Sequence, residues 1–269
     1  MPNSDAADYD RLIEHVFFAH YEPGTRSFEF NRDELIAAAT ELGISVPRNL
    51  GDVIYTYRFG RRQLPERIRE TAGTEYWTIP GAGRARYRFE LRQHVHIVPN
   101  DLLTVTKVPE ATPGLIRMYA LSDEQALLAK VRYNRLIDIF TGLVCYSLQN
   151  HLRTTVRGIG QVETDEVYVG VDRYGAHYIL PVQAKGGTDV LGTTQIEQDI
   201  SMCAEKFPGL ICRAIAAQFI IDDVIALFEL QAEDGDIRLL QERHYRLVAP
   251  DDLSEEEIAN YRSHTPDGS

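Results

Sequence analysis

The stretch of residues 162–187, VETDEVYVGVDRYGAHYILPVQAKGG, constrains the fold of this chain more than any other. Its first half alternates apolar and polar residues, its second half contains an apolar run, and residues 172–175 between them are typical of a tight turn. The pattern predicts two antiparallel strands joined as a hairpin. Both strands carry polar residues at the same end of the hairpin, with Asp165 on the first and Gln183 and Lys185 on the second.

Strand geometry predicts which of these side chains can act together. Side chains two positions apart on a strand share a face. Glu163 and Asp165 are therefore predicted on one face of the first strand, and Thr164 and Glu166 on the other. Glu166 then points away from Asp165 unless a bulge redirects it.

Pairing around the predicted turn brings Asp165 and Glu163 near Gln183 and Lys185. A hard cation such as Mg²⁺ takes oxygen ligands and keeps several waters. Asp165 offers a carboxylate, Gln183 an amide oxygen and Ala184 a main-chain carbonyl, which together form a candidate metal site. A lysine beside a metal-bound water can help to deprotonate it and can stabilise charge on a phosphate under attack.

Two interpretations of the hairpin remain open on these residues alone. In the first, Asp165 and Lys185 form an exposed ion pair, which contributes little to stability. In the second, they belong to a metal-dependent active site. The apolar run 178–182 favours the second, because an unpaired lysine at the end of a buried strand would be costly.

Asp165, seventeen intervening residues and Gln183-Ala184-Lys185 resemble the PD-(D/E)XK signature of restriction-endonuclease-like nucleases. The resemblance covers about residues 122–221. It implies an αβββαβ core, Mg²⁺ as cofactor and Asp165, Gln183 and Lys185 as catalytic residues. It also implies metal binding by Asp165, Gln183 and the Ala184 carbonyl.

At the second position of the signature, where the family carries an acid, this chain has Gln183. The substitution removes a negative charge, which Glu163 or Glu197 could restore. The helix expected after the Gly-Gly loop carries Gln195 and Glu197, and these side chains could face a substrate or a second metal.

The flanking pattern predicts an α/β sandwich. A capping box opens a long helical segment at 122–152, bent near residues 141–142, which confines the first core strand to about 153–158. An amphipathic helix follows at 193–207, and then a buried strand and a last hairpin before residue 250.

The N-terminal residues predict a separate small unit. Helical spacing appears at residues 9–20, 31–43 and 49–60, and a strand pair follows at 76–91. Three helices and a basic hairpin resemble a winged helix-turn-helix, in which a late helix enters the major groove and the hairpin touches the DNA backbone. The alternative is a helical cap with solvated arginines. The DNA-binding candidates are Arg58, Arg61, Arg62, Arg84, Arg86 and Arg88.

The charge of the chain is distributed unevenly. The formal net charge of −12 argues against a polyanionic partner, but residues 48–96 carry ten arginines, five acids and no lysine. This block is compatible with a local phosphate-binding surface. The sequence contains no apolar run of membrane-spanning length and no secretory signal, so we expect a cytoplasmic protein with reduced cysteines.

These features predict four parts: a winged-helix-like domain at 1–95, a connection at 96–121, a nuclease domain at 122–250 and an acidic tail at 251–269. The expected activity is Mg²⁺-dependent cleavage of double-stranded DNA by a homodimer of the type II restriction-endonuclease kind. The alternatives are a non-catalytic DNA-binding regulator or defence-system subunit, and a repair or junction nuclease that reads DNA shape.

Overall fold

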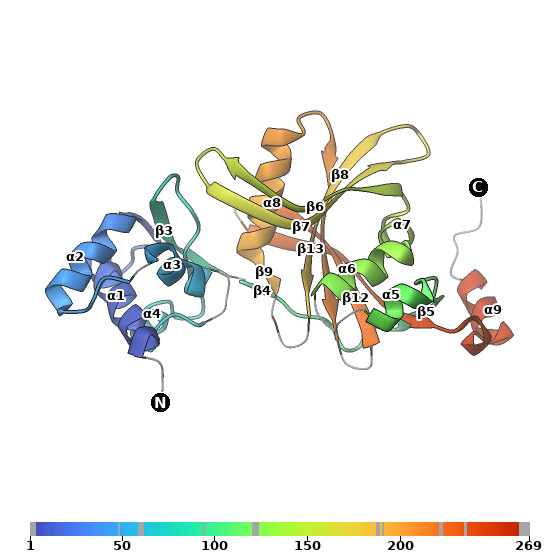
Figure 1. The fold of residues 1–269 in the computed structure, drawn as a ribbon, viewed down its shortest axis with the longest axis horizontal. Helices are drawn as coiled ribbons and strands as arrows, with labels where there is room; N and C mark the ends of the chain where they lie inside the picture. Colours follow the sequence, from blue (N-terminus) through green and yellow to red (C-terminus); the bar gives the residue numbers. More distant parts are fainter. Residues whose placement is uncertain are drawn as a thin grey trace.

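The computed structural model describes residues 4–47, 49–58, 62–93, 95–119, 124–186, 189, 191–220, 223–233 and 236–263. These residues form a mixed α/β structure with a large mixed sheet. Figure 1 shows two lobes, a smaller N-terminal one in blue and a larger one that contains the large sheet.

The smaller lobe is built from helices on a short antiparallel sheet of strand order β1-β3-β2. Its elements are α1 (Ser4–His20), β1 (Ser27–Asn31), α2 (Arg32–Leu42), α3 (Leu50–Arg58), α4 (Glu66–Glu70), β2 (Tyr76–Thr78) and β3 (Arg86–Arg92). The three predicted helices and the predicted strand pair are present. The helix α4 and the strand β1, which pairs with β3, were not predicted.

Local sequence explains the boundaries of α2. Asn31 and Glu34 form a capping box at its start, and Gly43 takes the left-handed conformation at its end (φ 64°). The core of the lobe is aromatic: the Phe17 ring lies 5.1 Å from Trp77 and 5.0 Å from Phe89, both edge to face. The lobe therefore has a hydrophobic core of its own.

The larger lobe follows the chain from residue 96. Its first elements are β4 (His96–Ile97), β5 (Val105–Pro109), α5 (Gly114–Tyr119), α6 (Glu124–Tyr133), α7 (Leu136–Thr141), β6 (Val144–Val156), β7 (Gly160–Val171) and β8 (His177–Lys185). The rest are β9 (Leu191–Gly192), α8 (Thr193–Lys206), β10 (Ile211–Cys212), β11 (Ala214–Phe219), β12 (Val224–Glu233), β13 (Asp236–Val248), η2 (Pro250–Asp252) and α9 (Glu255–Ser263).

The large sheet has the order β5-β13-β12-β11-β8-β7-β6, with β10 also beside β8. Strands β6, β7 and β8 form an antiparallel meander, and β11 runs parallel to β8. Leu180 and Val182 of β8 pack with α6 and α7, whereas Ile179 packs with Met202 and Cys203 of α8. The sheet is thus covered by α6 and α7 on one face and by α8 on the other.

The predicted helix at 122–152 is wrong in its second half. The helices end at Thr141, and β6 covers Val144–Val156, so the strand expected at 153–158 is only the end of a longer one. Strand β6 lies at the edge of the sheet and most of its side chains are exposed. An exposed edge strand needs no apolar alternation, which is why the pattern did not reveal it. Residues 120–123, with Ser122 of the predicted capping box, lie outside the described residues.

The segment predicted as a connection contributes to the sheet. Strand β5 pairs in parallel with β13, and β4 pairs with β9. Helix α9, in the predicted tail, is tied to β5: Lys107 Nζ lies 2.7 Å from Glu257 Oε1, and the Lys107 N–H donates to the Tyr261 hydroxyl at 3.0 Å. Both segments are therefore parts of the larger lobe.

Two further predictions concern the chain as a whole. Cys145, Cys203 and Cys212 are free thiols, and the first two are buried, as expected. Within the described ranges, no helix is both long and apolar enough to cross a membrane.

The two lobes meet along α8 and the β6–β7 turn. Arg92 of β3 forms an ion pair with Glu197 of α8, and the hydrogen-bond network turns the Gln198 amide oxygen toward the Arg58 guanidinium, 2.5 Å from Nη2. Gly81 of the smaller lobe lies so close to the turn that a Cβ there would be 2.1 Å from the Ile159 carbonyl oxygen. Figure 1 shows the β6–β7 turn reaching toward the smaller lobe.

Candidate active site

The candidate site begins where strands β7 and β8 separate. Their paired residues run from Val171 opposite His177 to Glu166 opposite Val182. At the next position the Asp165 carboxylate accepts the Ala184 N–H at 2.9 Å. The Asp165 side chain thus takes the place of the main-chain acceptor that a regular β-ladder would offer to the Ala184 N–H. The carboxylate is half-buried and lies between the two strands.

The alternation of side chains predicted for β7 is wrong at this point. Thr164 donates to Asp199 of α8 at 2.5 Å, while Glu166 accepts from Arg132 of α6 at 2.8 Å. These helices lie on opposite faces of the sheet, although the two residues were predicted on one face. Glu166 does point away from Asp165 toward α6, as the sequence indicated.

The neighbouring strand β6 is irregular at the same level. His151 has φ 49°, a left-handed conformation that is rare outside glycine, and it follows Asn150, which pairs with Glu166. Its Nε2 lies 3.1 Å from the Gln125 amide. Backbone conformations of this kind cost free energy and persist only where the surrounding structure holds them in place. They are found preferentially at functional sites.

Lys185 at the end of β8 reaches the start of α6. Its Nζ lies 2.8 Å from Glu124 Oε1, and the side chains of Lys185 and Glu124 are 15% and 35% exposed. An acid in the first turn of a helix is favoured by the helix dipole. Glu124 was not predicted, because no spacing rule links residues so far apart in the chain.

Gln183 is buried on the face covered by α8. Its amide nitrogen donates to Asp199 Oδ2 at 2.8 Å and to the main-chain oxygen of Glu163 at 3.1 Å. Gln183 and Asp199 are each only 1% exposed. Asp199 was also missed, although it had a sequence signal: it lies on the inward face of α8, between Ile196 and Cys203.

Burial determines the electrostatics of the two aspartates. It raises the pKa of Asp165, and the negative charge of Glu124 adds to the effect, while the Ala184 N–H and the Lys185 and His151 charges act against it. Burial also raises the pKa of Asp199 to about 7, against the hydrogen bonds from Thr164 and Gln183. Titratable groups with such shifts in a compact cluster indicate a functional site.

The supporting acids predicted from sequence have other partners. The Glu163 carboxylate lies 2.9 Å from Arg153 Nη2 and 3.7 Å from His151 Nδ1, and only its main-chain oxygen contacts Gln183. Glu197 pairs with Arg92. Gln195 is partly buried on α8.

The donor set fits Mg²⁺ in kind, although the arrangement differs from the predicted one. Mg²⁺ binds to proteins through one or two carboxylates and keeps several waters. Asp165 supplies a carboxylate whose Oδ2 is held by the Ala184 N–H, and the ion pair of Glu124 with Lys185 lies beside it. Among the described residues, no group of three or more His, Cys, Asp or Glu side chains is placed to hold a metal.

The predicted DNA-binding arginines differ in what they contact. Arg58 is partly buried between the lobes, and burial lowers its pKa, while Arg62 pairs with Asp10. Glu29 of β1 pairs with Arg88 at 2.7 Å and with Arg86 at 3.8 Å. Arg84 is exposed at the hairpin turn, and Arg61 lies outside the described residues.

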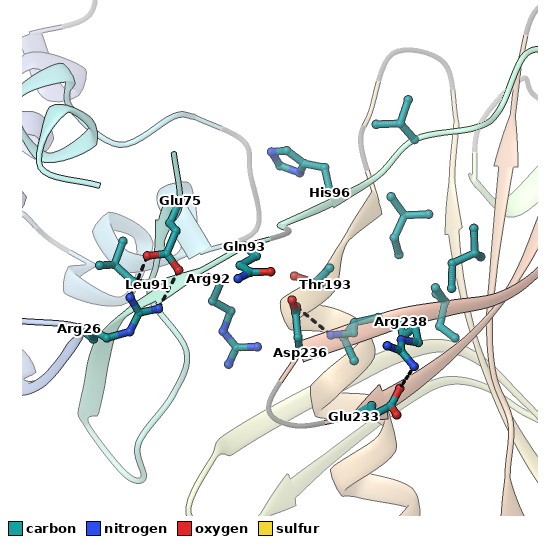
Figure 2. A pocket seen from close by; sticks show the side chains of 15 residues that line it. Arg26, Glu75, Leu91, Arg92, Gln93, His96, Thr193, Glu233, Asp236 and Arg238 are labelled. Atoms are coloured by element: carbon teal, nitrogen blue, oxygen red, sulfur yellow. Dashed lines mark hydrogen bonds and ion pairs between the residues drawn. The ribbon is translucent and has the colours of Figure 1, made fainter. Parts of the chain in front are cut away.

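Two cavities lie between the lobes. One, of about 570 Å³, is lined by Arg84 and Tyr87 of the smaller lobe and by Arg157 of the β6–β7 turn, and is basic. The other, of about 750 Å³, lies between β3 and the β12–β13 hairpin (Figure 2). Two of its three arginines, Arg26 and Arg238, are paired with acids of the same lining, and Asp165, Gln183 and Lys185 do not line it.

Comparison with known proteins provides no relative. No protein-family model matches the chain, and neither the curated proteins nor the solved structures contain a match.

Proposed function

We propose that the protein is a Mg²⁺-dependent DNA endonuclease of the PD-(D/E)XK kind, with the properties of a type II restriction endonuclease. The observation that carries the proposal is the position of Asp165. Its carboxylate lies between the separating strands β7 and β8, bonded to Ala184, directly before Lys185. The succession of α6, α7, β6, β7, β8, α8 and β11, interrupted only by the two-residue strands β9 and β10, supports the αβββαβ core that the signature implies.

In this proposal Asp165 holds the metal, with the Gln183 amide oxygen and the Ala184 carbonyl as further ligands. Bound Mg²⁺ would supply an activated water and would neutralise charge on the scissile phosphate. Lys185, as an ammonium, would orient the attacking water, whose proton would pass to solvent, and would then stabilise the negative charge of the pentavalent phosphate. Glu124 keeps the Lys185 ammonium in place at 2.8 Å.

The smaller lobe is proposed to bind DNA as a winged helix-turn-helix. Support comes from helices α1, α2 and α3 and from the basic hairpin of β2 and β3. Arg84 at the hairpin turn and Arg157 of the larger lobe line one basic cleft, so a DNA backbone there would contact both lobes. Arg58 is assigned to the contact between the lobes instead of to DNA.

A homodimer is proposed because cleavage of both strands requires two sites related by a two-fold axis. The edge strand β6 exposes Val144, Tyr146 and Leu148. Exposed apolar residues on a strand at the edge of a sheet offer a second copy a surface on which to pair.

The test is incubation of the purified protein with long unmethylated DNA and Mg²⁺. Discrete fragments that Lys185→Ala no longer produces would support the proposal. If varied duplex, single-stranded and branched DNA all stay intact, the nuclease proposal fails. Cleavage at branches or mismatches, with plain duplex left intact, would instead support a junction or repair nuclease.

The second candidate is a DNA-binding regulator or defence-system subunit without catalysis. The observation that favours it is the lack, within the described ranges, of three His, Cys, Asp or Glu side chains arranged around a metal position. Such a protein would bind DNA with a steep dependence on salt but would never cut it.

A further inference from the structure

The Gln183 side chain is held by two groups that accept hydrogen bonds. An amide NH₂ has two hydrogens, and both are used here, on Asp199 Oδ2 at 2.8 Å and on the main-chain oxygen of Glu163 at 3.1 Å. A main-chain carbonyl accepts at every pH. The nitrogen of Gln183 must therefore face this pair, and its oxygen must face away from it.

Asp199 is itself fixed. It belongs to α8, and its second oxygen accepts the Thr164 hydroxyl at 2.5 Å. Both of its oxygens are thus bonded in a site that is almost fully buried. The pair joins the inward face of α8 to both β7 and β8, at the level where Asp165 leaves the ladder.

We propose that Asp199 is a positioning residue that holds Gln183 with its amide oxygen available as a metal ligand. This inference rests on the proposed nuclease function. It explains how glutamine can occupy a position where the signature carries an acid, because the missing negative charge lies one hydrogen bond further out, on Asp199.

The same geometry predicts that Gln183 and Asp199 are a matched pair. A glutamate at 183 would place a second carboxylate against Asp199 in a buried site, where two neighbouring carboxylates cannot both stay ionised at low cost. An asparagine at 199 could turn its own amide toward Gln183 and so release it. Exchange of the two groups, by Gln183→Glu with Asp199→Asn, would restore one acid and one amide.

The experiment is a double-mutant cycle of Gln183→Glu and Asp199→Asn in the full chain. Binding of Mn²⁺ is measured by calorimetry and the unfolding midpoint by thermal denaturation. Loss of a hydrogen-bond partner behind a metal ligand typically weakens metal binding by about 10- to 100-fold. We expect each single variant to fall in this range, and the double variant to recover most of the affinity and of the unfolding temperature.

Asp172→Asn is the matched control. Asp172 accepts hydrogen bonds from Tyr174 and Ala176 at the other end of the same hairpin, so its loss lowers stability without contact to Gln183. Its Mn²⁺ affinity should equal that of the wild type.

The outcomes separate the inference from the proposed function. If the wild type binds Mn²⁺ and cuts DNA while Asp199→Asn binds Mn²⁺ equally well, the inference is overturned and the nuclease proposal stands. Additive losses in the double variant also overturn it. A wild type that binds no Mn²⁺ and cuts no DNA overturns both.

Discussion

Lys185 at the end of β8 and Glu124 at the start of α6 form an ion pair, with Nζ 2.8 Å from Oε1. The pair fastens the last residue of a central strand to the first turn of the covering helix. It keeps the ammonium group beside Asp165, whose pKa is affected by both charges. The lysine is thus held by an acid 61 residues away in the sequence.

Substitution of Lys185 by alanine tests the chemical role of the lysine. We expect cleavage to fall by about 10²-fold or more, the range found for loss of one group that stabilises charge in the transition state. Folding should change little, because partly exposed ion pairs contribute about 0–1 kcal/mol. The measurements are the single-turnover cleavage rate and the unfolding midpoint.

Lys206→Ala is the control for this substitution. Lys206 forms an ion pair with Glu205 at 2.8 Å on the surface of α8, so its loss removes a similar pair from outside the site. Cleavage should continue at the wild-type rate. Equal rates for Lys185→Ala and the wild type would remove the lysine from the mechanism.

Substitution of Asp165 by asparagine should abolish cleavage and leave the fold at least as stable at pH 8. Burial raises the pKa of this carboxyl above its ordinary value of 3.8, so the ionised form costs the folded state free energy. The side-chain amide oxygen that Asp165→Asn introduces can still accept the Ala184 N–H.

The pH dependence of this effect has a definite sign. The folded state binds the Asp165 proton more tightly than the unfolded state, so wild-type stability contributed by this group rises as the pH falls toward 3.8. The stability advantage of the variant should be largest above the folded pKa and should vanish at low pH. Chemical denaturation from pH 8 to pH 4 measures the difference in free energy of unfolding between the variant and the wild type. A difference that grows as the pH falls would contradict the raised pKa of Asp165.

Substitution of Gly81 by alanine should disturb the contact between the lobes. A Cβ at this position would lie 2.1 Å from the main-chain oxygen of Ile159, a distance that requires the β6–β7 turn or the smaller lobe to move. We expect a larger radius of gyration in solution scattering and slower cleavage. Gly114→Ala is the control, because the space around Gly114 is open.

Much of the fold could be predicted, because the buried strands carry a local signal. Alternation and the apolar run identified β7 and β8, and the spacing of Ile196 and Cys203 identified α8. The strands β6 and β5 lie at the two edges of the sheet. Their side chains are largely exposed or half-exposed, so their sequences carry no pattern that separates strand from helix or loop.

The site could be predicted only in part, for a related reason. Asp165, Gln183 and Lys185 share a hairpin, so strand geometry brings them together without knowledge of the fold. Asp199 and Glu124 reach them from helices on opposite faces of the sheet, which only the tertiary structure determines. An acid on the inward face of an amphipathic helix was nevertheless a usable signal, because a buried aspartate requires a donor.

The exposed Arg84 provides the sharpest test of DNA binding by the smaller lobe. Arg84 lines the basic cleft that Arg157 also lines. Loss of one phosphate contact weakens binding similarly for all sequences and lowers the slope of log affinity against log salt by about 1. We therefore expect Arg84→Ala to lower both the affinity and the salt slope, measured by fluorescence anisotropy in EDTA so that no cleavage occurs.

Arg62→Ala is the matched control, because Arg62 is engaged by Asp10 within the lobe, and its salt slope should stay at the wild-type value. Equal slopes for the wild type and Arg84→Ala would place the DNA elsewhere on the protein.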